Sequence, residues 1–383
     1  MKKILIFLLT LCIAAFSATT VVFAEEDRAK GAKSVYVTDG EASDELYSKN
    51  ADERYPIASM VKIMTALICF EAIENGELQL DEKITVSPNA SGMGGSQMFL
   101  DTGLEYAVGD LIKGVIVVSA NDACVALAER IAGSEEGFVE LMNQKANELD
   151  MQNTHFANCT GLPASGGYSS AKDVAKMLSK LSKYDKYHEY AQVWLEDYSH
   201  PDGRVTTFTN TNKLIRFYQG CDGGKTGFTN EAGFCLAATA KRNGLRVISV
   251  VIGESNSKTR FADSSKLLDQ AFGAYVAKNI VSKDEIVGEL NVNGGKTNLP
   301  YGLKEDLTAT VRRNADDEIS VKTEFYDLQL PITQGTVIGK MYAVSNGKIL
   351  GEAEVYAFAD LTKENYGDAV GRVLGGWNVK DKG

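Results

Sequence analysis

The sequence predicts an α+β fold in two parts, a larger mixed domain followed by a small all-β domain. Strand-like segments lie on either side of a helix-rich stretch that runs from about residue 59 to residue 190. After about residue 282, apolar and polar residues alternate along several short segments, which is the period of a half-buried strand. Strands that enclose a helical middle favour an α+β domain whose sheet joins its first and last segments.

Residues 1–24 have the features of a secretory signal peptide. Lys2 and Lys3 give the charged start, residues 4–15 are apolar, and Val22-Phe23-Ala24 offers a cleavage site ahead of two glutamates. The uncharged run is also long enough to leave an uncleaved membrane anchor open as an alternative. We therefore expect an exported, extracytoplasmic protein of the cell envelope.

Residues 25–280 are expected to form the larger, catalytic domain. It begins with a short strand at residues 33–38, continues through the helical middle, and returns to strand patterns at residues 234–240 and 245–253. A helical stretch over residues 260–277 closes it. Any catalytic machinery is expected here, because the part that follows carries no constellation of reactive side chains.

Residues 281–360 are expected to form the small β-rich accessory domain. Apolar residues alternate with polar ones around residues 286–292, 307–311 and 319–325. Asn346-Gly347 is a strong signal for a hairpin turn. The segment therefore reads as several short strands joined by tight turns.

Residues 361–383 are expected to form a tail that contains a candidate amphipathic helix. Its apolar residues recur at helical spacing on one face: Tyr366, Val370, Val373, Leu374 and Trp377. Such a helix lies on a membrane surface, whereas each of the glycines in this stretch weakens a helix by about 1 kcal/mol. Peripheral contact with the outer face of the cytoplasmic membrane and a frayed tail are both open.

Composition excludes several classes of protein. The chain has 383 residues, 44% of them apolar and 24% charged, which is a globular balance. Its formal net charge of −11 argues against nucleic acid as the main partner. It has only 3 histidines, so neither a histidine-rich metal site nor a Ser-His-Asp triad is favoured. We expect no metal and no organic cofactor.

Five cysteines follow the leader: Cys69, Cys124, Cys159, Cys221 and Cys235. An odd number with no CxxC spacing fits neither a zinc site nor a regular disulfide framework. Several of them lie in apolar stretches, so we expect buried free thiols.

Three short polar elements are candidates for an active site, in this order: Ser59-Met60-Val61-Lys62, Ser119-Ala120-Asn121 and Lys225-Thr226-Gly227. The first precedes a helical run, so its serine and lysine face the same way one turn apart. A serine is a weak nucleophile until a base takes its proton. A partly desolvated lysine near the positive end of a helix has a lowered pKa and can be that base. Taken alone, Ser59 also fits an ordinary N-cap and Lys62 a solvated helix lysine.

The second and third elements offer polar groups to a substrate. Ser119 and Asn121 lie between two helical patterns, the second expected to start at Asp122 as its N-cap, so a hydroxyl and a carboxamide can face a cleft. Lys225-Thr226 offers positive charge and a hydroxyl donor to a carboxylate, and Gly227 beside a strand edge lets a substrate backbone approach closely. A capped turn and a surface turn are the plainer explanations of each element alone.

The three elements together resemble the active-site set of the penicillin-binding proteins and serine β-lactamases. The similarity to the low-molecular-mass D-alanyl-D-alanine carboxypeptidases is closer and covers about residues 30–277. It rests on the following segments: Pro56-Ile57-Ala58-Ser59-Met60-Val61-Lys62-Ile63-Met64-Thr65, Gly95-Ser96-Gln97-Met98-Phe99-Leu100, Ser119-Ala120-Asn121-Asp122-Ala123, Gly161-Leu162 with Ser169-Ser170-Ala171, and Gly224-Lys225-Thr226-Gly227-Phe228-Thr229. The family often has glycine where Ala120 stands. The resemblance implies a β-lactamase/transpeptidase-like domain, with an antiparallel sheet flanked by helices, and then the family's accessory β domain.

The resemblance implies catalytic roles for several of these residues. Ser59 would attack the carbonyl between the two terminal D-alanines of a peptidoglycan stem peptide, and Lys62 would accept its proton. The backbone N–H groups of Ser59 and Phe228 would form the oxyanion hole. Ser119, helped by Lys225, would pass a proton to the departing D-alanine, and water would then release the shortened peptide.

The resemblance also implies what the cleft binds. Asn121 would hold the peptide amide, and Lys225 with Thr226 and the neighbouring Gly227 would hold the terminal carboxylate. β-Lactams would acylate the same serine and inhibit the enzyme. Arg260, at the head of the last helix, could assist, although we expect it to form a surface ion pair.

Two other functions are weighed against this one. A class A-like β-lactamase needs a carboxylate to activate the deacylating water, and Glu140 to Asn143 offers a Glu-x-x-Asn, but in a helical run that reads as part of the core. No glutamate lies between Gly161 and Ser170, where one is needed. A non-catalytic wall-binding protein on the same fold is the second alternative, and the intact set of candidate residues argues against it.

Overall fold

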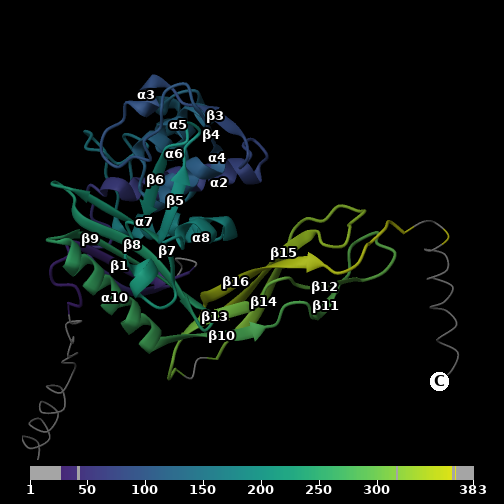
Figure 1. Cartoon of the computed structure of the whole chain (residues 1–383). Helices are drawn as coiled ribbons and strands as arrows, with labels where there is room; N and C mark the ends of the chain where they lie inside the picture. The colour runs from purple at the N-terminus through teal and green to yellow at the C-terminus, as the bar shows by residue number, and fades with distance from the viewer. Residues whose placement is uncertain (1–26, 41–43, 316–317, 365–366, 368–383) are drawn as a thin grey trace, which may run out of the picture.

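The computed structural model describes residues 27–40, 44–315, 318–364 and 367, and it contains a larger mixed part and a smaller β part (Figure 1). The signal peptide expected over residues 1–24 and the apolar residues of the expected tail helix lie outside these residues. In the part of the chain that the structure describes, no helix combines the length and apolar character that a membrane span requires.

A five-stranded antiparallel sheet is the centre of the larger part. Its strands are ordered β2-β1-β9-β8-β7, with these bounds: β1 (Ser34–Asp39), β2 (Glu45–Lys49), β7 (Cys221–Thr229), β8 (Gly233–Arg242) and β9 (Leu245–Glu254). β1 pairs with β9, so the prediction that the sheet joins the first and last segments of this domain is confirmed. β7 lies at the edge of the sheet, and one side of its backbone is therefore open to a ligand.

Helices cover both faces of this sheet (Figure 1). One face carries the helix-rich layer: the 3-10 turn η1 (Ala58–Val61), α2 (Lys62–Glu74), α3 (Pro88–Ser91), α4 (Val108–Val117), α5 (Asn121–Ala132), α6 (Glu135–Glu148), α7 (Ala171–Leu181) and α8 (Asp185–Ala191). Two short hairpins, β3 (Lys83–Thr85) with β4 (Glu105–Ala107) and β5 (Leu195–Ser199) with β6 (Val205–Thr209), belong to the same layer. The other face is covered by α10 (Ser257–Ala274) and the short α9 (Leu214–Phe217), whose Leu214 belongs to the same core as Leu267 and Leu268 of α10.

The sheet is apolar on both faces because each faces a helical layer. Along β9, Ile248 and Val250 belong to the core under the helix-rich layer, whereas Val247 and Val251 belong to the core under α10. Neighbouring side chains of a strand point to opposite faces, so a doubly covered strand reads as a continuous apolar run. This explains why the sequences of β8 and β9 were recognisable as strands.

The last helix of the larger part ends earlier than expected. A helix was predicted over residues 260–277, but α10 begins at Ser257, where the side chain of Asn256 accepts the N–H of Thr259 at 2.9 Å, and ends at Ala274. The next residues form β10 (Tyr275–Val281). An aromatic and a β-branched residue favour a strand at this point.

The smaller part is all β. β10 pairs with β13 (Leu307–Arg312), and a five-stranded sheet follows the order β11-β12-β16-β15-β14, with bounds β11 (Ile286–Leu290), β12 (Leu299–Leu303), β14 (Ser320–Phe325), β15 (Val337–Ser345) and β16 (Lys348–Ala357). The hairpin turn predicted at Asn346-Gly347 is confirmed: it joins β15 to β16, and both residues have positive φ, 51° and 79°.

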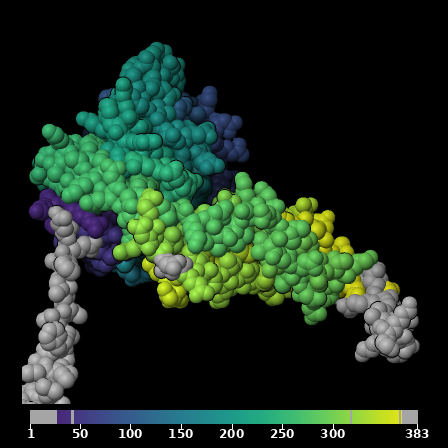
Figure 2. Space-filling model, turned by 90° about the horizontal axis from the view of Figure 1, so that it is seen from below, coloured from purple at the N-terminus to yellow at the C-terminus, as the bar shows by residue number. Residues whose placement is uncertain are grey.

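The smaller part extends from one side of the larger one (Figure 2). The side chain of Arg313 donates to the carbonyls of Phe272 and Gly273 at the end of α10. Lys348, at the start of β16, forms an ion pair with Asp44 over 2.7 Å. These contacts attach the β part to the sheet and to α10, on elements other than the free edge of β7.

The cysteines agree with the expectation of buried thiols. Cys69, Cys124, Cys159, Cys221 and Cys235 are all free and buried among the described residues. Burial raises the pKa of the Cys124 thiol to about 12, so this thiol is neutral and acts as a small apolar side chain.

Candidate active site

Ser59 lies in the 3-10 turn η1, directly before α2. Ala58, the residue before it, has a φ of 47°, a conformation that side chains other than glycine rarely adopt. The first helix position of α2 is Lys62, and its Nζ donates to Ser59 Oγ over 3.2 Å. Ser59 is therefore not the N-cap of α2, and its hydroxyl faces the lysine amine instead.

Lys62 is buried, with 1% of its surface exposed. Its Nζ also donates to the carbonyl oxygen of Thr160. Burial lowers the pKa of Lys62 below its usual value and outweighs the nearby acidic groups, including Asp122. A lysine in this position loses its proton more readily than an exposed lysine, and its neutral form can then accept the proton of the serine.

The loop that carries Thr160 touches the nucleophile segment directly. Gly161 has a φ of 77°, and a Cβ at this position would lie 2.1 Å from the carbonyl oxygen of Ala58. The side chain of Asn158 holds the loop by accepting the N–H of Gly161 at 2.7 Å and that of Thr160 at 3.2 Å. Only glycine permits this approach. Because the loop lies so close, the carbonyl of Thr160 reaches Lys62 Nζ and accepts a hydrogen bond from it.

Ser119 and Asn121 lie at the junction of α4 and α5. Ser119 has a φ of 66°, where glycine is usual, and its hydroxyl is buried without a hydrogen-bond partner. The Nδ2 of Asn121 donates to the carbonyl of Gly94 at 2.7 Å, while its Oδ1 is buried and unpaired. Buried polar atoms are nearly always paired in folded proteins, so two open ones at one helix junction point to a ligand.

Asp122 does not cap α5 as predicted. The N-cap is Ala120, two residues before the predicted one, and the helix begins at Asn121. The Asp122 carboxylate is buried and accepts the backbone N–H groups of Met98, at 3.1 Å, and Leu100, at 3.0 Å. It therefore fixes the loop around residues 93–101 against the start of α5, and in doing so supports Asn121.

The third element lies inside β7, at the free edge of the sheet, rather than in a turn before a strand. Lys225 is buried, and its Nζ donates to the carbonyl of Thr226 at 3.1 Å. Burial, together with the positive charge of Lys62, holds the pKa of Lys225 well below its usual value. Thr226 retains 8% exposure, whereas Phe228 is half exposed and its ring lies 4.3 Å from that of Phe234.

Gly227 allows β7 to approach the nucleophile segment. A Cβ at this position would lie 2.6 Å from the carbonyl oxygen of Ile57 and 3.3 Å from the backbone nitrogen of Ser59. The space beside Gly227 is therefore occupied by the protein's own backbone. This contact brings Ser59 next to the strand that carries Phe228.

Arg260 is buried, and the prediction of a surface ion pair is wrong. Its guanidinium donates to the carbonyls of Gly227 and Cys235, each at 3.2 Å, and its Nε is buried without a partner. Burial lowers the pKa of Arg260 to about 10. The arginine thus holds β7 and β8 through their backbone carbonyls, and its positive charge contributes to the lowered pKa of Lys225.

The sequence did not indicate the Thr160 carbonyl or the Asn158 side chain. A backbone oxygen carries no residue signature, so nothing local could have identified Thr160. Asn158 stands three residues before Gly161, and asparagine is the residue that caps such a turn through its own side chain. The spacing of Asn158 and Gly161 was therefore the one sequence feature that could have indicated this loop.

The chain is similar to known proteins over most of its length. Residues 21–256 match the family described as D-alanyl-D-alanine carboxypeptidase, and residues 275–363 match the C-terminal domain of penicillin-binding protein 5. The D-alanyl-D-alanine carboxypeptidase DacF of Bacillus subtilis is 39% identical over 350 residues, which are 90% of each chain.

Solved structures give the same result. Penicillin-binding protein 5 of Haemophilus influenzae is 31% identical, with a TM-score of 0.67 over 87% of this chain and 98% of that one. A penicillin-binding protein 3 of Streptococcus pneumoniae is 27% identical, with a TM-score of 0.69 over 86% of this chain and 99% of that one. Both similarities extend across the larger part and the β part.

Proposed function

This chain belongs to the D-alanyl-D-alanine carboxypeptidase family, and we propose that Ser59 is the residue through which it removes the terminal D-alanine of a peptidoglycan stem peptide. The observation that carries the proposal is the buried amine of Lys62, 3.2 Å from Ser59 Oγ, with a lowered pKa. A nucleophile within hydrogen-bonding reach of a base whose pKa is lowered is the requirement for acyl transfer.

The proposed reaction has two steps. Lys62 takes the Ser59 proton while Oγ bonds to the carbonyl carbon, and the C–N bond breaks as Ser119, assisted by Lys225, gives its proton to the leaving D-alanine. The proton held on Lys62 would then restore the Ser119 hydroxyl. Water, giving one proton to Lys62, would attack the ester, and that proton would return to Ser59 Oγ as the shortened peptide leaves. The backbone N–H groups of Ser59 and Phe228 would stabilise the charge that develops on the carbonyl oxygen in both steps.

The substrate would lie along the free edge of β7. The unpaired Oδ1 of Asn121 suits a peptide N–H, and the Lys225 amine with the Thr226 hydroxyl can donate hydrogen bonds to the terminal carboxylate. Gly227 would act by keeping β7 against the nucleophile segment. No metal or organic cofactor takes part in this scheme.

The remaining segments complete the proposal. Residues 1–24 would be a signal peptide, residues 25–280 the catalytic domain, residues 281–360 the accessory β domain, and residues 361–383 a tail that contacts the outer face of the cytoplasmic membrane. The enzyme would act outside the cytoplasm, in the cell envelope, where its substrate is exposed.

β-Lactams are expected to acylate Ser59. Brief exposure to benzylpenicillin should add the mass of one penicillin, and peptide mapping should place it on the segment that contains Ser59. The adduct should persist, because among the described residues no carboxylate is hydrogen-bonded to Ser59 or Lys62. Rapid turnover with no lasting adduct would favour a class A-like β-lactamase instead.

Glu140 provides the control for that experiment. It is exposed on α6, and Asn143 of the same Glu-x-x-Asn accepts the N–H of Phe156 at 2.9 Å rather than facing the cleft. Glu140→Gln should therefore leave both acylation and the persistence of the adduct unchanged. A longer-lived adduct in this variant would assign Glu140 to deacylation and contradict the proposed mechanism.

Two substitutions of Ser119 are expected to have the same effect on activity but different effects on stability. Ser119→Gly and Ser119→Ala both remove the proposed proton donor, so both should lose most D-alanine release. Because φ is 66° at this position, the glycine variant should be about 1 kcal/mol more stable than the alanine variant. Urea unfolding of the two variants, with wild type alongside, measures the difference. Equal stability would show that the backbone relaxes at this junction.

A non-catalytic wall-binding protein remains the alternative from another class. Release of D-alanine from a synthetic peptide that ends in two D-alanines distinguishes the two functions. If the wild-type protein binds this peptide and releases no D-alanine, the binding function is favoured.

A further inference from the structure

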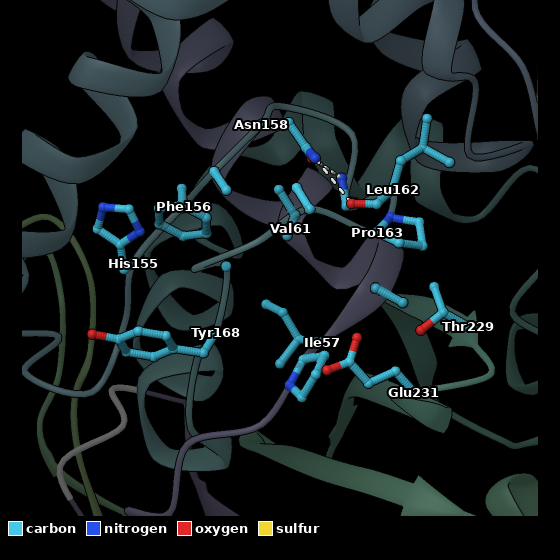
Figure 3. Close-up of a pocket in the computed structure, with 16 residues that line it drawn as sticks. Ile57, Val61, His155, Phe156, Asn158, Leu162, Pro163, Tyr168, Thr229 and Glu231 are labelled. Carbon is cyan, nitrogen blue, oxygen red and sulfur yellow. Dashed lines mark hydrogen bonds between the residues drawn. The ribbon is translucent and has the colours of Figure 1, made fainter.

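The two halves of β7 are held in place in different ways. From Gly227 onward the strand lies against the segment before α2, where the carbonyl of Ile57 packs beside Gly227. Thr229 and Ile57 then line the same cavity, of about 470 Å³ including the part that is open to solvent (Figure 3). The first half, which leads into Lys225, instead contacts α8 and the segment before α9. A separate set of contacts therefore decides where Lys225 lies.

Pairing with β8 does not fix the first half of β7 by itself. The register between the two strands shifts between Cys221 and Gly223. Gly224 has a φ of 123°, and a Cβ at this position would lie 2.2 Å from the carbonyl oxygen of Ala237 on β8. An irregularity of this kind disrupts the ladder of backbone hydrogen bonds between two strands. The backbone just before Lys225 is therefore supported from outside the sheet.

Two buried side chains hold the peptide unit between Gly223 and Gly224 at both of its polar groups. The hydroxyl oxygen of Tyr187, on α8, accepts the N–H of Gly224 at 2.7 Å. Asn212 Nδ2 donates to the carbonyl of Gly223 at 3.2 Å. A Cβ on Gly223 would lie 2.7 Å from the Tyr187 hydroxyl, so the tyrosine also packs directly on the strand. This peptide unit is thus fixed to α8 and to the segment before α9.

The residue that follows this peptide unit carries the amine expected to bind substrate. Lys225 is buried, and its Nζ donates to the carbonyl of Thr226. That acceptor lies on the next residue of β7 and moves with the strand, so the position of the amine follows the backbone. A displacement of about 1 Å at a reacting site can lower the rate by about 10²-fold. The hold on the backbone before Lys225 therefore bears on substrate binding.

We propose that Tyr187 is a positioning residue for the binding of the free carboxylate at the end of the peptide. With Asn212, it fixes the peptide unit before Lys225, and the backbone held in this way places the Lys225 amine and the Thr226 hydroxyl. Tyr187 would not touch the substrate, because it is buried and its hydroxyl is occupied by Gly224. The inference rests on the proposed function, since it assumes that the carboxylate binds at β7. The property that Tyr187 controls is the preference for a free carboxyl terminus over a blocked one.

Tyr187→Phe tests the proposal, because it removes the hydroxyl and keeps the ring. The substrates are two peptides that end in L-lysyl-D-alanyl-D-alanine with both lysine amines acetylated, one with a free carboxyl terminus and one with a carboxamide. Release of D-alanine or of D-alaninamide is measured, and wild type should have the higher kcat/KM for the free carboxylate. Tyr187→Phe should lower this preference by about fivefold, within the range for one hydrogen bond. The loss should appear as a higher KM for the carboxylate peptide with kcat nearly unchanged, because the lost contact serves binding.

Tyr190→Phe is the matched control. Tyr190 lies on the same helix, one turn later, and packs on α4, where a Cβ on Gly109 would lie 2.9 Å from its hydroxyl. Loss of this hydroxyl should change neither KM nor the preference. Asn212→Ala is the second test variant, since it frees the carbonyl of the same peptide unit. It should raise KM for the carboxylate peptide in the same direction as Tyr187→Phe.

The possible failures are distinguishable. If Tyr187→Phe keeps the wild-type KM and preference, or loses rate equally on both peptides through kcat, the tyrosine only supports the fold and the positioning role is wrong. The same follows if Tyr190→Phe loses the preference to an equal extent. Where wild type cleaves the carboxamide too slowly to measure, KM for the carboxylate peptide decides alone. Absence of D-alanine release from the carboxylate peptide by wild type would instead contradict the proposed function itself.

Discussion

Ser59→Ala is expected to lower D-alanine release by roughly 10³-fold or more, because the acyl-enzyme cannot form without Oγ. Ser59 lies on η1, and its side chain contacts Lys62 at the cleft. Removal of the Ser59 hydroxyl therefore creates no large cavity, and the protein should still fold. The measurement is D-alanine released from a peptide that ends in two D-alanines, together with the mass of the protein after penicillin exposure.

The control for this variant is Ser255→Ala. Ser255 also stands in a Ser-x-x-Lys sequence, with Lys258, but it is exposed and lies two residues before α10. Loss of its hydroxyl should change neither D-alanine release nor the adduct. If Ser59→Ala still forms a covalent penicillin adduct, then another residue is the nucleophile, and the assignment of the active site is wrong.

The secondary structure and the strand pairing were largely predictable from local pattern. β8 and β9 are apolar on both faces because a helical layer covers each, and such strands read as continuous apolar runs. The hairpin at Asn346-Gly347 was predictable because both turn residues need positive φ, which these two types tolerate. Each of these features depends on residues that are adjacent in the sequence.

The support of the site was not predictable, because it depends on contacts between distant segments. Asp122 looks like an N-cap in sequence, and only the folded chain shows that its carboxylate accepts the N–H groups of Met98 and Leu100. Gly227 looked like a place for substrate, whereas the Ile57 carbonyl occupies the space beside it. Arg260 looked like a surface residue for the same reason, since the strand that buries it lies far away in the sequence.

The candidate residues could be predicted from residue type and from their order in the sequence. The structure adds their burial and their hydrogen bonds, which the order does not reveal. A serine and an asparagine near one another in sequence do not reveal that Ser119 Oγ and Asn121 Oδ1 are both left without partners in the folded protein. Nor does a lysine in a helix reveal that its amine is buried against a backbone carbonyl. Burial is a property of the whole fold, and burial is what lowers the pKa of Lys62.

Lys62→Met is expected to lower D-alanine release by about 10²–10⁴-fold, the usual contribution of a general base. Methionine is close to lysine in length and is apolar, so it fits a site that is 1% exposed. In wild type, kcat/KM should rise with pH as Lys62 loses its proton, through a pKa below the usual lysine value. The residual activity of the variant should lack this rise. The pH profile of kcat/KM in both proteins is the measurement.

The same substitution is expected to change how stability depends on pH. In the unfolded chain Lys62 has the ordinary lysine pKa, about 10.4, whereas in the folded protein the pKa is lower. Between the two values the unfolded chain holds a proton that the folded protein does not. Wild type therefore gains stability as pH rises through this window, and loses it as pH falls toward the folded pKa.

The difference in unfolding free energy between wild type and Lys62→Met should grow with pH by at most about 1.4 kcal/mol per pH unit. Urea unfolding at several pH values measures it. Lys266→Met, which removes an exposed lysine of α10, should show no such trend. If the Lys62→Met difference is also flat, Lys62 keeps its proton in the folded protein at these pH values. In that case it could not be the base that activates Ser59, because a lysine that already carries its proton cannot accept another from the serine.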